Sequence, residues 1–235
     1  MSGKQLQKYY TSRVYGKPSK KVLFLFSALG HKKWFYLPTI YMYILNGYQV
    51  IAYDASHRII FDKDIQKFLD VGFAIVADVE KHVIRLKKEG VHTFSTHGNS
   101  MGTLYAMRSA IDIPEIQKVI VNLTYGKLSD NIWSWFILKD IKKHIIKQGL
   151  TKEEVEKIFK PLSPVQIAPL LKSKQILLFL ARHDKVTLFE QGLQFKKALE
   201  KANVNLTYKE NRLFGHNINL VLNNFKYKIL LGFLR

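Results

Sequence analysis

Apolar residues fall along the chain either in short continuous runs or at helical spacing. Short apolar runs predict buried strands, and apolar positions three to four residues apart predict amphipathic helices. The longest helical pattern spans Asp64–Lys88 and is followed by Gly90, a typical residue just beyond a helix end. Strands are predicted at residues 22–26, 49–53, 91–96, 119–123, 175–181 and 205–209, and the other helices at 32–45, 103–110, 188–201 and 218–233. This alternation predicts an α/β fold with a mostly parallel sheet flanked by helices.

The strand pattern disappears between residues 127 and 174, where two or three helices are expected. Asp130 can open the first helix, and Thr151 with Glu154 has the spacing of a capping box for the second. The pair Ser163–Pro164 is typical of the start of a third helix. We therefore predict a helical cap inserted at 127–174 within a single domain that spans residues 1–235.

The first predicted helix of this insertion is rich in apolar residues, among them Trp133, Trp135 and Phe136. This apolar area is wider than one core-facing stripe of a helix requires. The rings either pack on the sheet or cover an apolar substrate pocket, for which Leu29 is a further candidate.

Charge and composition exclude several classes of protein. The formal net charge is +19, but 30 of the 37 basic residues are Lys and they are dispersed along the chain. Zinc-finger spacing and RNA-binding aromatic motifs are absent, which argues against nucleic-acid binding and leaves peripheral contact with an anionic membrane open. The lack of Cys excludes disulfides and thiolate ligands. Without a secretory signal or an apolar run of about 18 residues, a cytoplasmic protein is expected.

The segment Gly98-Asn99-Ser100-Met101-Gly102 fits the G-x-S-x-G pattern of a nucleophile elbow. It lies between a predicted strand and a predicted helix, which is the context that this turn requires. Gly98 and Gly102, two positions before and after the serine, leave room for the close approach of helix and strand. Ser100 is therefore the candidate nucleophile.

A serine nucleophile needs a base, and the base needs a carboxylate to orient it. His216 follows Gly215 in the predicted loop between the last strand and the last helix, and it is the best placed of the eight histidines. Asp184 comes just after the strand at 175–181, at the carboxyl end where sites gather in open α/β sheets. Asp184 could instead cap the next helix, and Asp130 is the second candidate for the acid.

With the order Ser100, Asp184, His216, the chain resembles the α/β-hydrolase superfamily over nearly its whole length. The resemblance implies a Ser-His-Asp triad and, since the leading segment is too short for the family's full set of N-terminal strands, a sheet of about six or seven strands. It also implies an oxyanion hole formed by the amide of Met101 and a second amide from the loop at residues 26–30. That loop has Phe-Ser where the family usually has His-Gly, so Ser27, Ala28 and Leu29 are all candidates, with Ala28 favoured.

These features predict a serine hydrolase of carboxylic esters, either a carboxylesterase or an enzyme similar to monoacylglycerol lipases and lysophospholipases. Such a mechanism needs no metal and no organic cofactor. A thioesterase, acyltransferase or peptidase would use the same triad. A non-catalytic protein that binds lipid or another surface is the alternative from a different class, motivated by the charge and by the basic, apolar tail at residues 225–235.

Overall fold

The computed structural model describes residues 6–29, 33–56, 64–134 and 138–235. Within them a seven-stranded sheet has the order β1-β3-β2-β4-β5-β6-β7. β1 pairs antiparallel with β3, and every other neighbouring pair is parallel. The strands are β1 (Tyr10–Tyr15), β2 (Lys21–Phe26), β3 (Tyr48–Ala55), β4 (Thr93–Asn99), β5 (Ile116–Asn122), β6 (Gln175–Ala181) and β7 (Asn205–Asn211).

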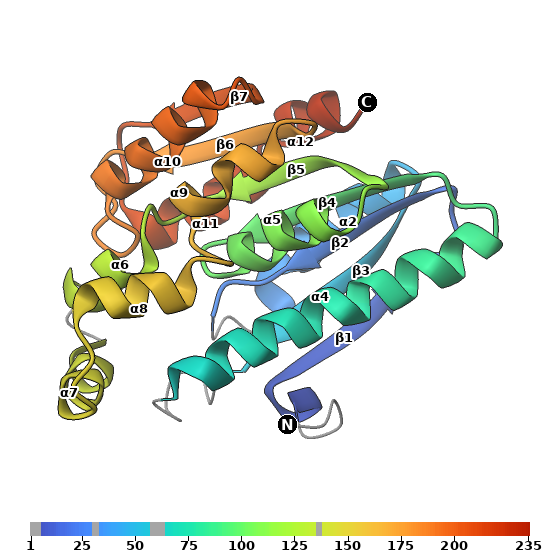
Figure 1. The fold of residues 1–235 in the computed structure, drawn as a ribbon. Coiled ribbons are helices and arrows are strands. Elements are labelled where there is room, and N and C mark those ends of the chain that lie inside the picture. Colours follow the sequence, from blue (N-terminus) through green and yellow to red (C-terminus); the bar gives the residue numbers. More distant parts are fainter. Residues whose placement is uncertain (1–5, 30–32, 57–63, 135–137) are drawn as a thin grey trace.

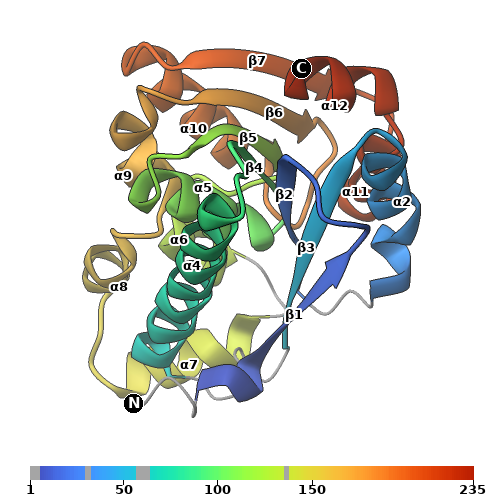
Figure 2. The same ribbon diagram turned by 90° about the vertical axis from the view of Figure 1, so that its right-hand side faces the viewer.

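Helices cover both faces of this sheet (Figures 1 and 2). α4, α5 and α10 pack on one face, whereas α2 and α12 pack on the other. The main helices are α2 (Leu37–Leu45), α4 (Ile65–Lys88), α5 (Gly102–Asp112), α10 (Phe189–Lys201), α11 (His216–Asn224) and α12 (Tyr227–Leu234). The predicted α/β fold with a mostly parallel sheet is confirmed.

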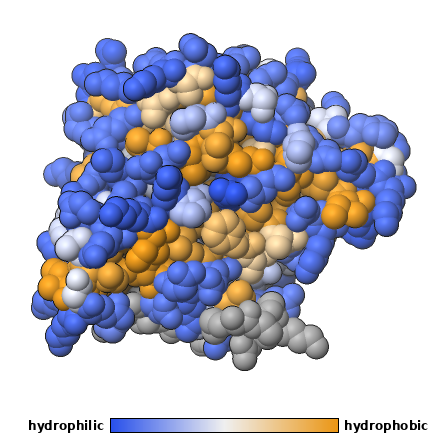
Figure 3. All heavy atoms as spheres, in the orientation of Figure 1, coloured by the Kyte–Doolittle hydropathy of each residue, from blue (hydrophilic) through white to orange (hydrophobic). Residues whose placement is uncertain are grey.

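β2 illustrates why the central strands appear in the sequence as continuous apolar runs. Val22, Phe24 and Phe26 lie in the core on the side of α4 and α5. Leu23 and Leu25 alternate with them and lie in the core on the side of α2 and α12. A strand that is buried on both faces has no position at which a polar side chain could reach water. Polar residues instead surround a band of apolar residues on the outer surface drawn in Figure 3.

Three parts of the chain differ from the sequence-based prediction. β1 was not predicted, because this edge strand buries few side chains and so lacks an apolar pattern. The helix expected at 32–45 starts as the 3-10 turn η2 (Lys33–Tyr36) and becomes α-helical only at Leu37, next to Pro38. The helix expected at 218–233 is wrong as one element, since α11 and α12 are separated at Phe225 and Lys226.

Between β5 and β6 the chain forms helices, as predicted for residues 127–174, but the described residues form four α-helices and a 3-10 turn where two or three helices were expected. Thr151 and Glu154 form the expected capping box at the start of α8. Asp130 does not open the first helix but lies within its first turn, because α6 begins two residues earlier. Pro164 is in the first turn of α9 as predicted. The helices here are α6 (Leu128–Ser134), α7 (Lys139–Lys147), α8 (Lys152–Phe159), α9 (Pro164–Ile167) and the 3-10 turn η4 (Ala168–Leu171).

Candidate active site

Ser100 occupies a strained turn between β4 and α5. Its backbone φ is +50°, a conformation that residues other than Gly rarely adopt. A Cβ at Gly98 would lie 2.5 Å from the Cα of Thr103, and one at Gly102 would lie 2.5 Å from the Phe26 carbonyl oxygen. Both glycines are thus required for the close packing of strand, turn and helix, as the motif predicts.

The structure brings Ser100, His216 and Asp184 together from three loops at the carboxyl edge of the sheet. The Nε2 atom of His216 lies 3.1 Å from the Oγ atom of Ser100, and its Nδ1 atom lies 2.7 Å from Oδ2 of Asp184. All three residues are buried, with at most 7% of each exposed. A neutral imidazole in this position can accept the serine proton at Nε2 while Nδ1–H donates to the carboxylate.

Asp184 has the hydrogen bonds of a carboxylate that stays ionised. Its Oδ1 atom accepts from the amides of Val186 and Thr187 at 2.8 and 2.9 Å, and Oδ2 accepts from the Thr187 hydroxyl at 2.8 Å. Burial raises the pKa of Asp184, but hydrogen bonds and the charge of His216 outweigh it, so the pKa is lowered overall. The other acid candidate, Asp130, pairs instead with Lys152 at 2.5 Å.

The two predicted oxyanion amides have different surroundings. Met101 immediately precedes α5, where amides have no acceptor within the helix and the helix dipole favours negative charge. The amide of Ala28 donates to the Tyr36 hydroxyl at 2.9 Å, and this pair is buried. The Ala28 amide is therefore engaged by a side chain that the sequence did not link to it.

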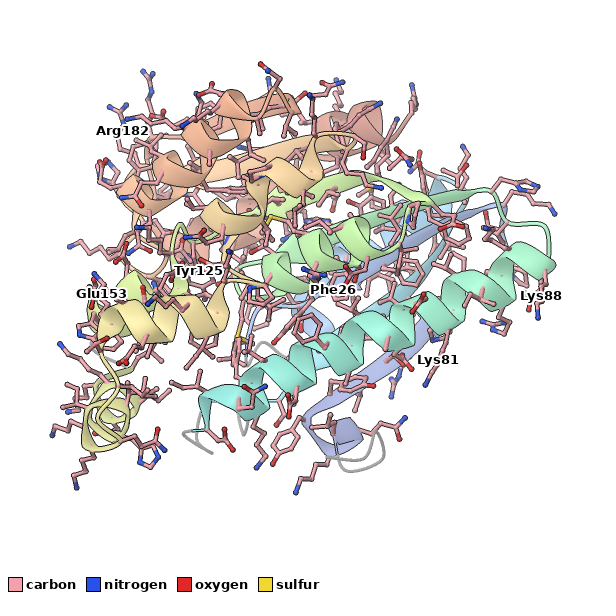
Figure 4. All side chains as sticks on the ribbon, viewed as in Figure 1. Phe26, Lys81, Lys88, Tyr125, Glu153 and Arg182 are labelled. Atoms are coloured by element: carbon pink, nitrogen blue, oxygen red, sulfur yellow. The ribbon has the colours of Figure 1, made fainter. Side chains whose placement is uncertain are left out.

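Tyr125, which sequence reasoning missed, is a neighbour of the candidate nucleophile Ser100. Its hydroxyl lies 3.5 Å from the Ser100 Oγ atom, and the ring is buried. The residue lies on the short segment between β5 and α6 (Figure 4), and burial raises its pKa to about 12. The hydroxyl thus remains a neutral hydrogen-bond donor. Its place three residues beyond β5, a strand of a parallel sheet, was a signal that could have identified it.

A buried cluster of asparagines ties α11 to the strand that ends at the nucleophile. Asn99 accepts at Oδ1 from the side-chain amides of Asn122 and Asn224, each at 2.8 Å. Asn122 accepts in turn from Asn223 at 2.8 Å, and Asn223 accepts from Asn211 at 2.6 Å. This network joins β4, β5 and β7 to the helix that begins with the candidate base, and it fixes that helix relative to the elbow.

The predicted pocket residues are only partly within the described part of the chain. Leu29 and Trp133 are half-buried and both pack against the main core. The ammonium of Lys142 lies 6.0 Å from the Trp133 ring centre. Trp135 and Phe136 lie outside the described residues.

Two further findings concern cofactors and membranes. In the part of the chain that the structure describes, no three His, Asp or Glu side chains are arranged to hold a metal ion. None of the described helices combines the length and the apolar composition needed to cross a membrane.

Comparison with known proteins finds similarity in structure alone. No protein-family model and no curated protein sequence matches the chain. A carboxyl esterase from Bacillus coagulans is 12% identical, with a TM-score of 0.67, 96% of this chain covered and 94% of that chain. A monoacylglycerol lipase from Paleococcus ferrophilus is 15% identical, with a TM-score of 0.58 and coverage of 96% and 98%.

A puromycin-hydrolysing peptidase from Mycobacterium tuberculosis is 16% identical, with a TM-score of 0.66 and 93% of this chain covered. The chain spans only 35% of the length of that peptidase, whereas it matches nearly the full length of the esterase and the lipase. Sequence identities this low establish the fold and nothing finer.

Proposed function

The chain has the α/β-hydrolase fold, and we propose that it is a serine hydrolase that cleaves carboxylic esters. The observation that carries the proposal is the continuous hydrogen-bonded line from Asp184 through His216 to Ser100, buried at the carboxyl edge of the sheet. A buried imidazole held between a carboxylate and a strained serine is the arrangement that makes a serine hydroxyl nucleophilic.

In the proposed reaction Ser100 attacks the ester carbonyl while His216 takes the hydroxyl proton. His216 then gives this proton to the leaving alcohol, and a water molecule activated in the same way releases the acyl group. Asp184 stays ionised, holds the tautomer of the imidazole and stabilises the imidazolium that forms.

The amide of Met101 supplies the first oxyanion donor in this proposal. The Ala28 amide supplies the second when the substrate oxygen replaces the Tyr36 hydroxyl as its acceptor. The Tyr125 hydroxyl, next to Ser100, is placed to hold the serine oxygen or to donate to a substrate oxygen. The Ala28 assignment comes from the family resemblance, whereas the Tyr125 assignment rests on its contact with Ser100.

The proposed substrates are carboxylic esters of the kind cleaved by carboxylesterases, monoacylglycerol lipases or lysophospholipases. Support comes from the apolar load of the segment at 127–174, which we propose as a cap, with Leu29 and Trp133 lining an acyl pocket. Trp135 and Phe136 are proposed for the same pocket on sequence alone. A peptidase is the second candidate function, because the similar structures include a peptidase as well as an esterase, although this chain spans only 35% of the peptidase.

A fluorophosphonate probe followed by a series of nitrophenyl esters tests the proposal. The wild-type protein should react with the probe and release nitrophenol. Ser100→Ala should abolish both, with an activity loss on the order of 10⁴ or more. Ser109→Ala is the matched control, since Ser109 is also buried and lies on α5. Ester turnover by Ser100→Ala near the wild-type rate would refute the assignment, and turnover of peptides alone would favour the second candidate.

A further inference from the structure

Five large apolar side chains are exposed along α11 and the loop before it. Leu213 is 80% exposed, Phe214 42%, Ile218 52%, Leu222 40% and Phe225 46%. Ile218, Leu222 and Phe225 follow at intervals of four and three residues, which places them on one face of the helix. We call these five residues the α11 surface. Single exposed apolar residues are ordinary, but five within thirteen positions require an explanation.

The α11 surface borders the candidate active site. α11 begins with His216, whose imidazole is buried against Asp184 and Ser100. Leu213 and Phe214 precede this residue by three and two positions in the loop, and Ile218 follows it by two positions. A binding partner that covers the α11 surface would therefore contact the protein beside the candidate nucleophile, Ser100.

Charge separates this region from the rest of the chain. Residues 211–235 contain no Asp or Glu but carry Arg212, Lys226, Lys228 and Arg235. Two of these four cations are also engaged within the protein, since Arg212 pairs with Glu210 at 3.3 Å and the Lys226 ammonium donates to the Asn211 side-chain oxygen at 2.5 Å. α11 itself has no charged residue, although 37 basic and 18 acidic residues are present among the 235 of the chain. The region thus combines an uncharged apolar face with cations at its flanks.

A second uncharged helix lies beside it. α2 contains no charged residue, and Thr39 on α2 donates to the carbonyl oxygen of Asn224 at the end of α11. Figure 2 shows the two helices side by side on one face of the sheet. α2 also exposes Tyr41 (60%) and Leu45 (84%).

We propose that the α11 surface docks onto anionic lipid membranes and presents the Ser100 site to esters held in the bilayer. An apolar helix face with basic flanks matches the boundary between acyl chains and anionic head groups. The net charge of +19 supplies the complementary long-range attraction. The choice of substrate rests on the proposed function, whereas the docking itself does not.

Sedimentation with vesicles tests the docking without any need for activity, because full-length Ser100→Ala protein can be used throughout. We expect it to sediment with vesicles of phosphatidylcholine and phosphatidylglycerol, and to bind them less well at high salt. Ile218→Gln/Leu222→Gln in this background should weaken binding about tenfold or more, since the protein then lacks two apolar side chains that would be buried in the membrane. Thermal unfolding shows whether this variant remains folded.

Ile84→Gln is the matched control, because Ile84 on α4 is also 52% exposed. It should bind vesicles like its parent. Equal binding by the double variant and this control would overturn the proposal, as would equal binding to pure phosphatidylcholine vesicles at low salt. A concentration-dependent dimer that Ile218→Gln/Leu222→Gln dissociates, without vesicle binding, would show that a second copy covers the surface instead. If the wild-type protein binds vesicles but hydrolyses no ester, only the proposed function would be refuted.

Discussion

Different interactions stabilise two regions of the molecule. One is the floor of the candidate site, by which we mean the residues around Ser100, Asp184 and His216 at the carboxyl edge of the sheet, and the other is the helical segment between β5 and β6. In the floor, the side chains of His216 and Asp184 are 7% and 2% exposed and lie 2.7 Å apart. In the helical segment, the ion pair of Lys152 and Asp130 has side chains that are 39% and 22% exposed. Hydrogen bonds between buried groups are costly to break, whereas exposed ion pairs contribute little.

One carboxylate links the helices of that segment. Glu156 on α8 accepts from the Ser129 amide at 3.2 Å and from the Ser163 hydroxyl at 2.6 Å, which connects α6, α8 and the start of α9. The Asn131 side-chain amide donates a hydrogen bond to the Val186 carbonyl oxygen at 2.6 Å, which joins α6 to the loop of Asp184. The comparison shows that buried hydrogen bonds between ionisable groups hold the floor, whereas the helical segment combines partly exposed polar contacts with apolar side chains, such as Val155 and Phe159, that are buried in the main core.

The strongest test of this comparison breaks the floor at Asp184. Asp184→Asn keeps the size of the side chain but favours the wrong tautomer of His216, so turnover should fall on the order of 10³ to 10⁴. Steady-state hydrolysis of a short nitrophenyl ester measures this. Asp130→Asn, in the helical segment, is the control and should leave turnover near wild type. A larger loss in Asp130→Asn than in Asp184→Asn would contradict the assignment of the acid.

Acid should weaken the floor through His97. This imidazole is fully buried, donates to or accepts from Tyr43 at 3.0 Å, and burial lowers its pKa from 6.5 to about 3. The unfolded chain therefore binds one more proton than the folded protein between these values, and stability falls as pH drops below 6.5. The slope contributed is about 1.4 kcal/mol per pH unit.

Urea unfolding at several pH values between 6.5 and 4.5 measures this slope. His97→Gln should reduce the dependence of the unfolding free energy on pH, because the titrating group is gone. Tyr43→Phe removes the hydrogen-bond partner but keeps the imidazole, so it should retain the slope. An unchanged slope in His97→Gln would show that other groups control the acid limb.

Tyr125 lies where the floor meets the helical segment. Tyr125→Phe removes the hydroxyl near Ser100 and should lower kcat about tenfold with little change in KM, which corresponds to the loss of about 1.4 kcal/mol in the transition state. Tyr105→Phe is the control, because its buried hydroxyl has no hydrogen-bond partner among the residues that the structure describes. Equal kinetics of the two variants would mean that the Tyr125 hydroxyl takes no part in the reaction.

The smallest expected effect concerns selectivity. Trp133→Ala should change the ratio of kcat/KM between long and short nitrophenyl esters by a few-fold, since each buried methylene of a substrate contributes about 0.8 kcal/mol. Turnover of the shortest ester should stay close to that of the wild type. A lower melting temperature with an unchanged ratio would assign Trp133 to packing alone.

Much of the fold follows from local sequence patterns. The strand at 175–181 is found at the predicted bounds, and Gly90, the residue after the C-cap Glu89 of α4, adopts a φ of +79° as its position predicts. The turn around Ser100 was also predictable, because the turn itself requires glycines two residues before and two residues after the serine. Such features depend on residues that are neighbours in the chain.

Other features depend on contacts between distant segments. The break between α11 and α12 lets Asn223 and Asn224 reach Asn122 and Asn99, while Leu230 packs on the sheet. No local pattern contains those partners, which lie more than a hundred residues away in the chain.

The sequence by itself determined the α/β class, the strand-turn-helix context of Ser100 and the chain order of the candidate nucleophile, acid and base. Only the tertiary structure decided that Asp184 rather than Asp130 meets His216, that Tyr36 engages the Ala28 amide and that Tyr125 lies beside the nucleophile. The reason is physical. Periodicity and turn chemistry act over a few residues, whereas the identity of a hydrogen-bond partner is set by which loops the parallel sheet brings to one edge.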